Sequence, residues 1–555
     1  MLSRRGAWLL FAPVLLILLG YVFYPSLRMF ILGVDAEQYA EIFSSMRSAN
    51  VRALINSVMI SVYTVVGAGL LGTTLAYLFF RYQFPLRRVL MAMAAFPLAL
   101  PPLVGVLAFL FLYGESGILP RSLQNLFGLA EVPFAFEGLW AVWLVHVYSM
   151  YVYFYLFVTA ALRTIDRSLL EASADLGASS FTAFRRVILP LLRPALVSAA
   201  LLVFMISMAS FTAPLLFAGT EPFLTLQIYN YKVNGDLALS ATVSTVLTGI
   251  CFAFLLLIEW TNRQRATGAA KGAAPPPLPV ESGWARALAL SGALVLVLFL
   301  LLPIATVVLI SFAQEGSWTY QIIPARYTLA NYGSLLSDPD VLSPILNSLR
   351  MATLATIGNI IFGVAAALVI TKTKVPGRGL VRLLAVLPFA IPGTVIAVNL
   401  IVTFNEATAL SGGQILVGTF WILPLAYFIR HIPLIVRSTT AALESYDDRL
   451  TEASADLGAR FVTTFRRVVL PVIGPGILAG TLLTFVTALG EFVSSIMLYV
   501  YSNRPISVEI LSQLRLYEFG TAAAYSVFLM LLIVLSTFVV SRLGIQGSDS
   551  VPDVL

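Results

Sequence analysis

Long apolar segments set the pattern of this chain. Twelve runs of about 20 residues, nearly free of charge, alternate with short polar segments. Runs of this length span the hydrocarbon core of a bilayer, and backbone groups inside lipid must be hydrogen-bonded within their own segment. The pattern therefore predicts an all-α integral membrane protein with about twelve transmembrane helices. The predicted spans are residues 8–32, 54–80, 89–113, 139–162, 195–218, 242–260, 285–312, 345–370, 383–404, 415–436, 477–500 and 522–540.

A repeat divides the chain into two related halves. The segment Glu171–Ala178, with the sequence EASADLGA, recurs letter for letter as Glu452–Ala459, 281 residues later. Each half holds six predicted spans, an even number, so both halves enter the membrane in the same orientation and form a parallel repeat. Shorter matches lie upstream, at an offset of 291: Asn56-Ser57 with Asn347-Ser348, Pro97 with Pro388, and Pro101 with Pro392.

The repeat sets the expected domain boundaries. We expect a first six-helix half at residues 1–271, with its repeated loop at 163–190. Residues 272–284 form the end of a flexible linker rich in proline and alanine. The second half then covers residues 285–555, with its loop at 437–471.

Composition excludes several other classes of protein. Of the 555 residues 59% are hydrophobic and only 11% are charged, whereas a soluble domain is about 25% charged. The single cysteine, Cys251, lies inside a predicted span, which excludes a disulfide framework and a cysteine-based metal site. The apolar run at the amino terminus continues past Gly20, so we interpret it as a retained helix and not as a cleaved signal peptide.

Charge predicts the orientation in the membrane. Cytoplasmic connections of membrane proteins are enriched in lysine and arginine. Most of the 34 lysines and arginines, Arg430 included, fall in or next to the connections on the side of both termini. We therefore expect a multi-pass inner-membrane protein with cytoplasmic termini. The net charge of +7 reflects this bias and needs no nucleic-acid partner.

The repeated loop carries the functional signal. Glu171 and Asp175 are four residues apart and share one face of a short helix, and Gly177 is suited to end that helix in a left-handed conformation. The pattern, followed after about nine residues by a hydrophobic residue, any residue and Leu-Pro, resembles the EAA loop of ABC-importer permeases, and it occurs between the fourth and fifth spans of each half.

The resemblance implies the fold of type I ABC importers and a set of partners. In that family the first loop helix docks on an ATP-binding subunit, so the resemblance implies coupling through four positions in each half: Glu171, Ala172, Asp175 and Gly177, and then Glu452, Ala453, Asp456 and Gly458. Two alternatives remain. The loop helices can lie on the lipid of the inner leaflet, and the two glutamates can stabilise the loop itself.

The chain lacks the means to hydrolyse ATP alone. No Gly-x-x-x-x-Gly-Lys-Ser/Thr phosphate-binding loop is present. By the resemblance, ATP and magnesium belong to two copies of a separate ATPase subunit, and a periplasmic or lipid-anchored binding protein delivers the solute. We expect no cofactor on this chain itself and no catalytic residue. An ion-coupled secondary transporter is the alternative from another class, but it gives no reason for the twin loops.

The substrate is less well indicated. The fused halves and the segment 217–229 resemble the permeases of ferric-iron importers, although importers of thiamine, phosphonate or polyamine share the plan. On the fourth span His146, Tyr148, Tyr151 and Tyr155 can contact a hard cation or can simply pack against neighbouring helices.

One carboxylate lies deep in an apolar run. Glu491 falls inside the eleventh predicted span, where an ionised side chain must face protein or water. Its counterpart in the first half is Ser210. Glu491 can line the path of a cation or can brace the helix through hydrogen bonds. We expect Glu406 to be solvated at the outer side and His431 to lie at an inner helix end.

Overall fold

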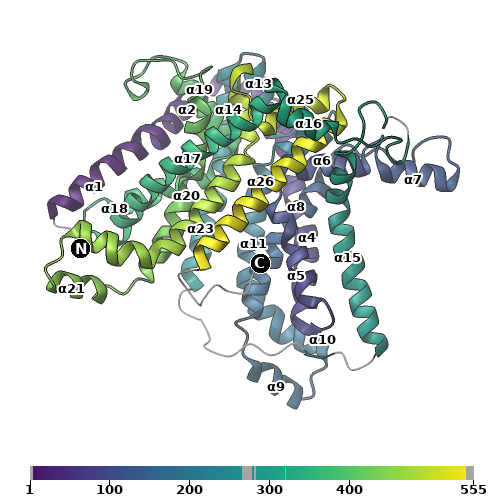
Figure 1. The fold of residues 1–555 in the computed structure, drawn as a ribbon, viewed down its shortest axis with the longest axis horizontal. Coiled ribbons are helices and arrows are strands. Elements are labelled where there is room, and N and C mark those ends of the chain that lie inside the picture. The colour runs from purple at the N-terminus through teal and green to yellow at the C-terminus, as the bar shows by residue number, and fades with distance from the viewer. Residues whose placement is uncertain (1–3, 266–277, 280–282, 319–320, 546–555) are drawn as a thin grey trace.

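A computed structural model describes residues 4–265, 278–279, 283–318 and 321–545. Helices dominate these residues (Figure 1), as the sequence predicts. The described part of the chain has one sheet, in which β1 (Tyr82–Gln83) pairs in parallel with β2 (Leu278–Pro279). Most of the predicted linker 272–284 lies outside the described residues.

The first half contains these helices, where η1 and η3 are π-helical and η2 is a 3₁₀-helix: α1 (Arg4–Ile17), η1 (Leu18–Phe23), α2 (Tyr24–Gly33), α3 (Ala36–Phe43), α4 (Ala49–Arg81), α5 (Arg87–Ala95), η2 (Phe96–Ala99), α6 (Pro102–Tyr113), α7 (Ile118–Phe127), α8 (Leu139–Leu162), α9 (Arg167–Asp175), α10 (Ser180–Ala183), η3 (Phe184–Ile188), α11 (Leu189–Met208), α12 (Thr212–Phe217), α13 (Leu224–Val233) and α14 (Leu237–Arg265).

The second half follows the same order, with η5 π-helical and η4 and η6 as 3₁₀-helices: α15 (Gly283–Ile310), α16 (Ala330–Ser337), α17 (Pro339–Lys372), α18 (Arg378–Ala390), α19 (Gly393–Phe404), η4 (Ala409–Ser411), α20 (Ile422–Glu444), α21 (Arg449–Asp456), α22 (Phe461–Thr464), η5 (Phe465–Val469), α23 (Leu470–Leu489), α24 (Val493–Leu498), η6 (Tyr501–Asn503), α25 (Ile506–Arg515) and α26 (Phe519–Ile545).

The number of spans differs slightly from the expected twelve. Ten helices in the described residues are long and apolar enough to cross a bilayer, and the bent pair α18–α19 makes an eleventh. The helix in the place of the tenth predicted span is α20, which is not among these candidates. It carries Arg430, His431 and Arg437 but packs between α17 and α23 as the repeat requires.

The fifth predicted span of each half is broken. In the first half α11 ends at Met208 and α12 begins at Thr212, and in the second half α23 ends at Leu489 and α24 begins at Val493. Pro214 explains the first break, because its ring would clash with the carbonyl of Ser210, four residues earlier, in a continuous helix. The prediction of one continuous helix at 195–218 and at 477–500 is therefore wrong, because the helix ends at Met208 in the first case and at Leu489 in the second.

The third predicted span of each half is also broken, at the repeated prolines. In the first half η2 and Pro101 separate α5 from α6, and in the second half α18 and α19 meet at an angle of 111° next to Pro392. Proline lacks a backbone N–H, so an i→i−4 hydrogen bond is lost at each position. Broken helices inside a membrane bundle are tolerated where they face protein or a cavity and not lipid.

The first helix of each half packs on the other half. Helix α1 lies against α17 and α18, and α15 lies against α5 and α6 (Figure 1). Phe11 and Leu18 of the first segment belong to the hydrophobic cluster that holds the core of the second half and part of the first, while Val297 and Leu300 of α15 belong to the other cluster, which is otherwise made by the first half. This reciprocal exchange joins the two halves through buried apolar surface.

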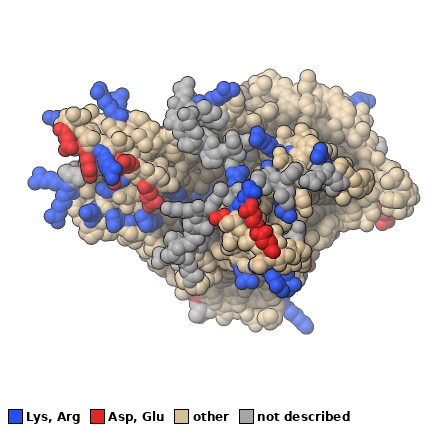
Figure 2. Space-filling model, turned by 90° about the horizontal axis from the view of Figure 1, so that it is seen from below, with Lys and Arg blue, Asp and Glu red and all other residues tan. Residues whose placement is uncertain are grey.

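The two copies of the repeated loop lie on one side of the molecule. In Figure 1 α9 and α21 are both at the lower side, and the two halves diverge toward it, while α13 and α25 lie at the upper side. Seen from below, lysine and arginine side chains gather on this face in separate groups (Figure 2).

Candidate functional site

The repeated loop has the same local geometry in both halves. In the first, the side chain of Asp166 accepts a hydrogen bond from the backbone of Ser168 at 2.9 Å and begins α9. Gly177 then ends the helix with φ of +76°, and Gly458 ends α21 with φ of +77°. A left-handed residue at this position closes the last helical turn, which is why glycine stands there.

Both loops present the same apolar side chain to the surroundings. Leu176 and Leu457 occupy equivalent positions, and each is 89% exposed. The flanking apolar positions are exposed as well: Leu169 and Leu450 before the glycine, and Phe181 and Val462 after it. Two equivalent, exposed apolar side chains on one face indicate a surface that another molecule covers.

The predicted coupling residues lie on the exposed surface of these loops. They are Glu171, Ala172, Asp175, Gly177, Glu452, Ala453, Asp456 and Gly458. Glu171 forms an ion pair with Arg167 of its own helix at 2.5 Å, and both side chains are exposed. Glu452 has no ion pair among the described residues.

Hydroxyl groups, and not the glutamates, hold the second loop together. Ser454 is bonded to Thr464 at 2.9 Å, and Tyr446 to Thr451 at 2.9 Å, and these side chains are buried. Lys372 ties the start of α21 to the end of α17 through Asp448 at 2.7 Å. Glu452 therefore stays available to a partner, whereas Glu171 is paired with Arg167 of its own helix.

A second polar site surrounds Glu491 at the break between α23 and α24. Glu491 is only 6% exposed, and its Oε1 accepts hydrogen bonds from the backbone N–H of Ser494 at 2.9 Å and from its hydroxyl at 3.0 Å. Its Oε2 lies 2.8 Å from Nε of Arg430 on α20. The backbone carbonyl of Glu491, freed by the break, accepts from Ser495 and Ser507.

Two expectations about this region are wrong. Arg430, predicted among the charges of the inner side, and His431, predicted at an inner helix end, both lie near the middle of α20, where His431 is buried and Arg430 pairs with Glu491. The rule for charged connections counts residues and cannot tell which charges pair inside the bundle. Glu406, in contrast, is exposed, as expected, and lies 3.7 Å from Arg28.

The first half has a neutral version of the same arrangement. His146 of α8 is bonded through Nδ1 to Ser207 at 3.0 Å and through Nε2 to Ser210 at 2.8 Å. Thr225 donates to the backbone carbonyl of Ser210, as Ser507 does to that of Glu491. The position equivalent to His146 is Tyr427 of α20, which is bonded to Ser495 at 2.7 Å. In each half a side chain of the fourth span thus forms a hydrogen bond with a residue at the break of the fifth span.

The two breaks meet across the boundary between the halves. The rings of Phe211 and Phe492, each next to a break residue, lie 6.2 Å apart. A Cβ atom added at Gly490 would lie 3.1 Å from Cβ of Pro101, at the break in the third span of the first half. The polar groups at 210 and 491 therefore flank a central, aromatic contact between the halves.

The tyrosines of the fourth span act in packing. The hydroxyl of Tyr148 donates to the carbonyl of Leu300 at 2.7 Å, and that of Tyr151 to the carbonyl of Ala94 at 2.6 Å. Tyr155 donates to the carbonyl of Met91 at 3.3 Å, and all three rings are buried. The three hydroxyl groups donate to backbone carbonyls of neighbouring helices and do not point toward a path for the solute.

The repeated Asn-Ser pair supports the segment after each fifth-span break. Ser57 accepts a hydrogen bond from the backbone of Leu224, where α13 begins, at 3.1 Å. Ser348 accepts from the backbone of Ile506, where α25 begins, at 2.8 Å. The sequence match at these positions therefore has a structural cause, a side-chain cap on a helix from elsewhere in the chain.

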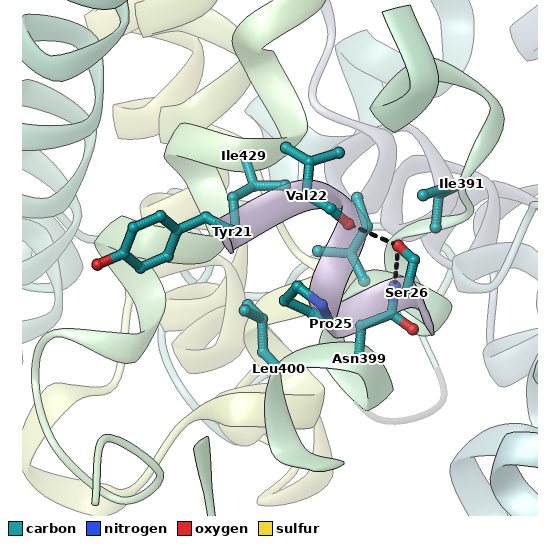
Figure 3. Close-up of a pocket in the computed structure, with 9 residues that line it drawn as sticks. Tyr21, Val22, Pro25, Ser26, Ile391, Asn399, Leu400 and Ile429 are labelled. Carbon is teal, nitrogen blue, oxygen red and sulfur yellow. Dashed lines mark hydrogen bonds between the residues drawn. The ribbon is translucent and has the colours of Figure 1, made fainter. Parts of the chain in front are cut away.

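A small pocket lies beside the other break of the second half. It is lined by residues of η1, α2, α19 and α20 and by Ile391 (Figure 3). Asn399 donates to the hydroxyl of Ser26 at 3.1 Å, and Ser26 donates to the carbonyl of Val22 at 2.8 Å. These bonds tie the exchanged first segment to α19. Among the described residues no group of three His, Cys, Asp or Glu side chains is placed to hold a metal.

Comparisons with known proteins agree with the repeat. The model of the family described as binding-protein-dependent transport system inner membrane component matches residues 68–266 and 359–544. A probable ABC transporter permease of Sinorhizobium fredii is 30% identical over 503 residues, which make up 89% of this chain and 87% of that protein. Each matched range contains one repeated loop and one broken fifth span.

Two further relatives differ in the solute that their names give. A ferric transport system permease of Actinobacillus pleuropneumoniae is 26% identical over 97% of this chain and 78% of that protein. A sulfate transport system permease of Salmonella typhimurium is 31% identical over 238 residues, 41% of this chain and 80% of that protein.

Proposed function

Because the chain belongs to the family of binding-protein-dependent transport system inner membrane components, we propose that it is the permease subunit of an ABC importer in which both six-helix halves are fused. The solute passes from a periplasmic or lipid-anchored binding protein to the cytoplasm. Two copies of a separate ATPase subunit, which hold ATP and magnesium, drive the cycle. The halves are residues 1–271 and 285–555, joined by the segment 272–284.

One observation carries this proposal, the matched exposure of the two loops. Leu176 and Leu457 are apolar, almost fully exposed and related by the repeat, so two identical partner subunits can bind them in the same way. A lipid surface is the alternative partner of these helices. It would not require Gly177 and Gly458 to present the leucines in the same conformation.

Co-purification with the ATPase subunit tests the docking. We expect Leu176→Asp with Leu457→Asp to lose the ATPase and transport while the chain stays folded in the membrane. Leu126→Asp is the matched control, because Leu126 is also a highly exposed leucine, at the tip of α7 and remote from the loops. If the double variant still binds the ATPase, or the native chain transports alone on an ion gradient, the proposal is wrong.

The orientation is open to a direct test. We propose that the face with α9 and α21 is cytoplasmic, together with both termini. The sole cysteine, Cys251, is buried, so a cysteine introduced at Leu176 provides a single reactive thiol. An impermeant thiol reagent should label it in inverted membrane vesicles and not in intact spheroplasts.

For the solute we propose ferric iron, on the basis of the relative that matches nearly the whole chain. Thiamine, phosphonate and polyamine remain alternatives, and the partial relative adds sulfate. Uptake of radioactive iron and radioactive sulfate by cells with the complete transporter distinguishes the two. Iron uptake that depends on this chain supports the proposal, and uptake of sulfate alone contradicts it.

A further inference from the structure

The guanidinium of Arg430 has unused hydrogen-bonding capacity inside the bundle. Arginine has five N–H donors, and here Nε is directed to Glu491. No described residue accepts a hydrogen bond from the two terminal nitrogens. One of them faces the start of α19 at Gly393, where any larger residue would collide with it. Gly393 therefore lets this nitrogen pack directly against the backbone of α19, while the Arg430 side chain as a whole stays 29% exposed.

The accessible member of the pair is the positive one. The side chain of Arg430 is 29% exposed, whereas that of Glu491 is 6% exposed and has hydrogen-bond donors on both oxygens. The pair also lies at the boundary between the halves, because Gly490 and Phe492, on either side of Glu491, both lie against residues of the first half. A solute at this boundary meets an arginine and not a free carboxylate.

We propose that Arg430 binds an oxyanion group of the transported solute, and that Glu491 neutralises Arg430 while the site is empty. The planar guanidinium fits carboxylate, sulfate and phosphate through two parallel hydrogen bonds. An unpaired charge at this depth would be costly, which gives the ion pair its role in the empty state. The inference rests on the proposed transport function and narrows its substrate class.

Two kinds of solute carry an oxyanion group that Arg430 could bind. A free oxyanion such as sulfate presents it directly, and a ferric complex presents it through its anionic oxygen ligands. A bare ferric ion does not fit, because Glu491 is buried and already neutralised by Arg430, and the described residues hold no group of three His, Cys, Asp or Glu side chains placed for a metal. Under this proposal Glu491 is a positioning residue for Arg430 and not a ligand of the metal.

Binding to the full-length chain in lipid nanodiscs, without ATPase or ATP, tests the proposal. The probes are sodium sulfate, sodium citrate and ferric citrate at matched ionic strength, followed by calorimetry. We expect saturable binding of at least one probe. Sulfate binding identifies a free oxyanion, and binding of ferric citrate but not of citrate identifies a ferric complex. Absence of saturable binding of all three would overturn the proposal.

The variants separate the anion site from a cation site. Glu491→Gln frees Arg430, so affinity should be kept or increased, whereas a cation site would lose binding. Arg430→Gln with Glu491→Gln removes both charges without leaving either one unpaired, and affinity should fall about tenfold or more. Arg437→Gln is the control, because it removes a charge from the same helix beside Phe389. Loss of binding in Glu491→Gln, or native affinity in the double variant, refutes the oxyanion site, whatever the ATPase experiment shows.

Discussion

A glycine on the second span of each half sets how closely the second and fourth spans pack, and the two positions should respond differently to substitution. Gly72 on α4 and Gly363 on α17 are equivalent under the repeat. A Cβ atom at Gly72 would lie 2.7 Å from Cβ of Phe154 and 2.8 Å from the backbone nitrogen of Tyr155 on α8. At Gly363 the three nearest atoms would all belong to the Ile435 side chain, with Cγ1 at 2.9 Å.

The expected cost follows from these distances. Nonbonded carbon atoms pack at about 3.5–4.0 Å, so Gly72→Ala must separate α4 from α8 by roughly 0.8 Å or more. Overpacking of this kind costs about 1–3 kcal/mol. Gly72→Ala should fall at the upper end, because it meets backbone, and Gly363→Ala at the lower end, because the isoleucine side chain can shift.

Thermal unfolding of the purified chain measures the difference. Alanine also favours helix over glycine by about 1 kcal/mol, so the reference is Gly105→Ala on α6, where an added Cβ meets no atom within 4 Å. The midpoint should be lowest for Gly72→Ala, then Gly363→Ala, then Gly105→Ala. If Gly72→Ala is as stable as Gly105→Ala, the close packing of α4 on α8 is wrong.

Three further predictions concern the hydrogen bonds of the site. Arg430→Gln leaves Glu491 buried without its partner and should destabilise the chain by about 3–5 kcal/mol, while the added change Glu491→Gln recovers most of that loss in a double-mutant cycle of unfolding free energies. Ser348→Ala removes the cap on α25 and should cost about 1 kcal/mol, seen as faster hydrogen exchange at the start of that helix and not elsewhere. Tyr151→Phe removes the hydroxyl that donates to the carbonyl of Ala94, so it should lower the unfolding temperature but keep the affinity for the solute unchanged, which separates packing from binding.

Much of the fold could be predicted from the sequence, because it depends on local signals. The apolar runs predicted helices, and the copy of Glu171–Gly177 at residue 452 predicted a second loop with the same geometry, which the left-handed glycines confirm. The breaks at residues 210 and 491 were missed because the apolar run continues through them, and a hydropathy pattern does not register a change of helix axis. Pro214 was the available signal in the first half.

The parts that could not be predicted depend on contacts between distant residues. Nothing in the local sequence indicates that α1 packs on the second half, since an apolar helix surface matches many partners equally well. The pairing of Arg430 with Glu491 joins residues 61 positions apart, which come together only in the folded chain. The arginine inside a predicted span was itself the available signal, because a charge in that position requires a partner.

The position of the polar contacts suggests how the loops and the central breaks act together under the proposed function. Each loop joins the fourth and fifth spans at the lower side, and the same two spans are tied again at the break, by His146 with Ser210 in one half and by Arg430 with Glu491 in the other. Two helices that are joined at both ends move together, so a displacement of α9 or α21 is transmitted to the break in the fifth span.

The reciprocal packing of α1 and α15 then carries the movement of each half to a helix of the other. The half with the ion pair differs in one respect, because an oxyanion bound to Arg430 competes with Glu491 for the same guanidinium. Under the proposed function, solute binding would therefore weaken the contact between Arg430 and Glu491 in the second half alone, which makes the two halves unequal beside the contact between Phe211 and Phe492.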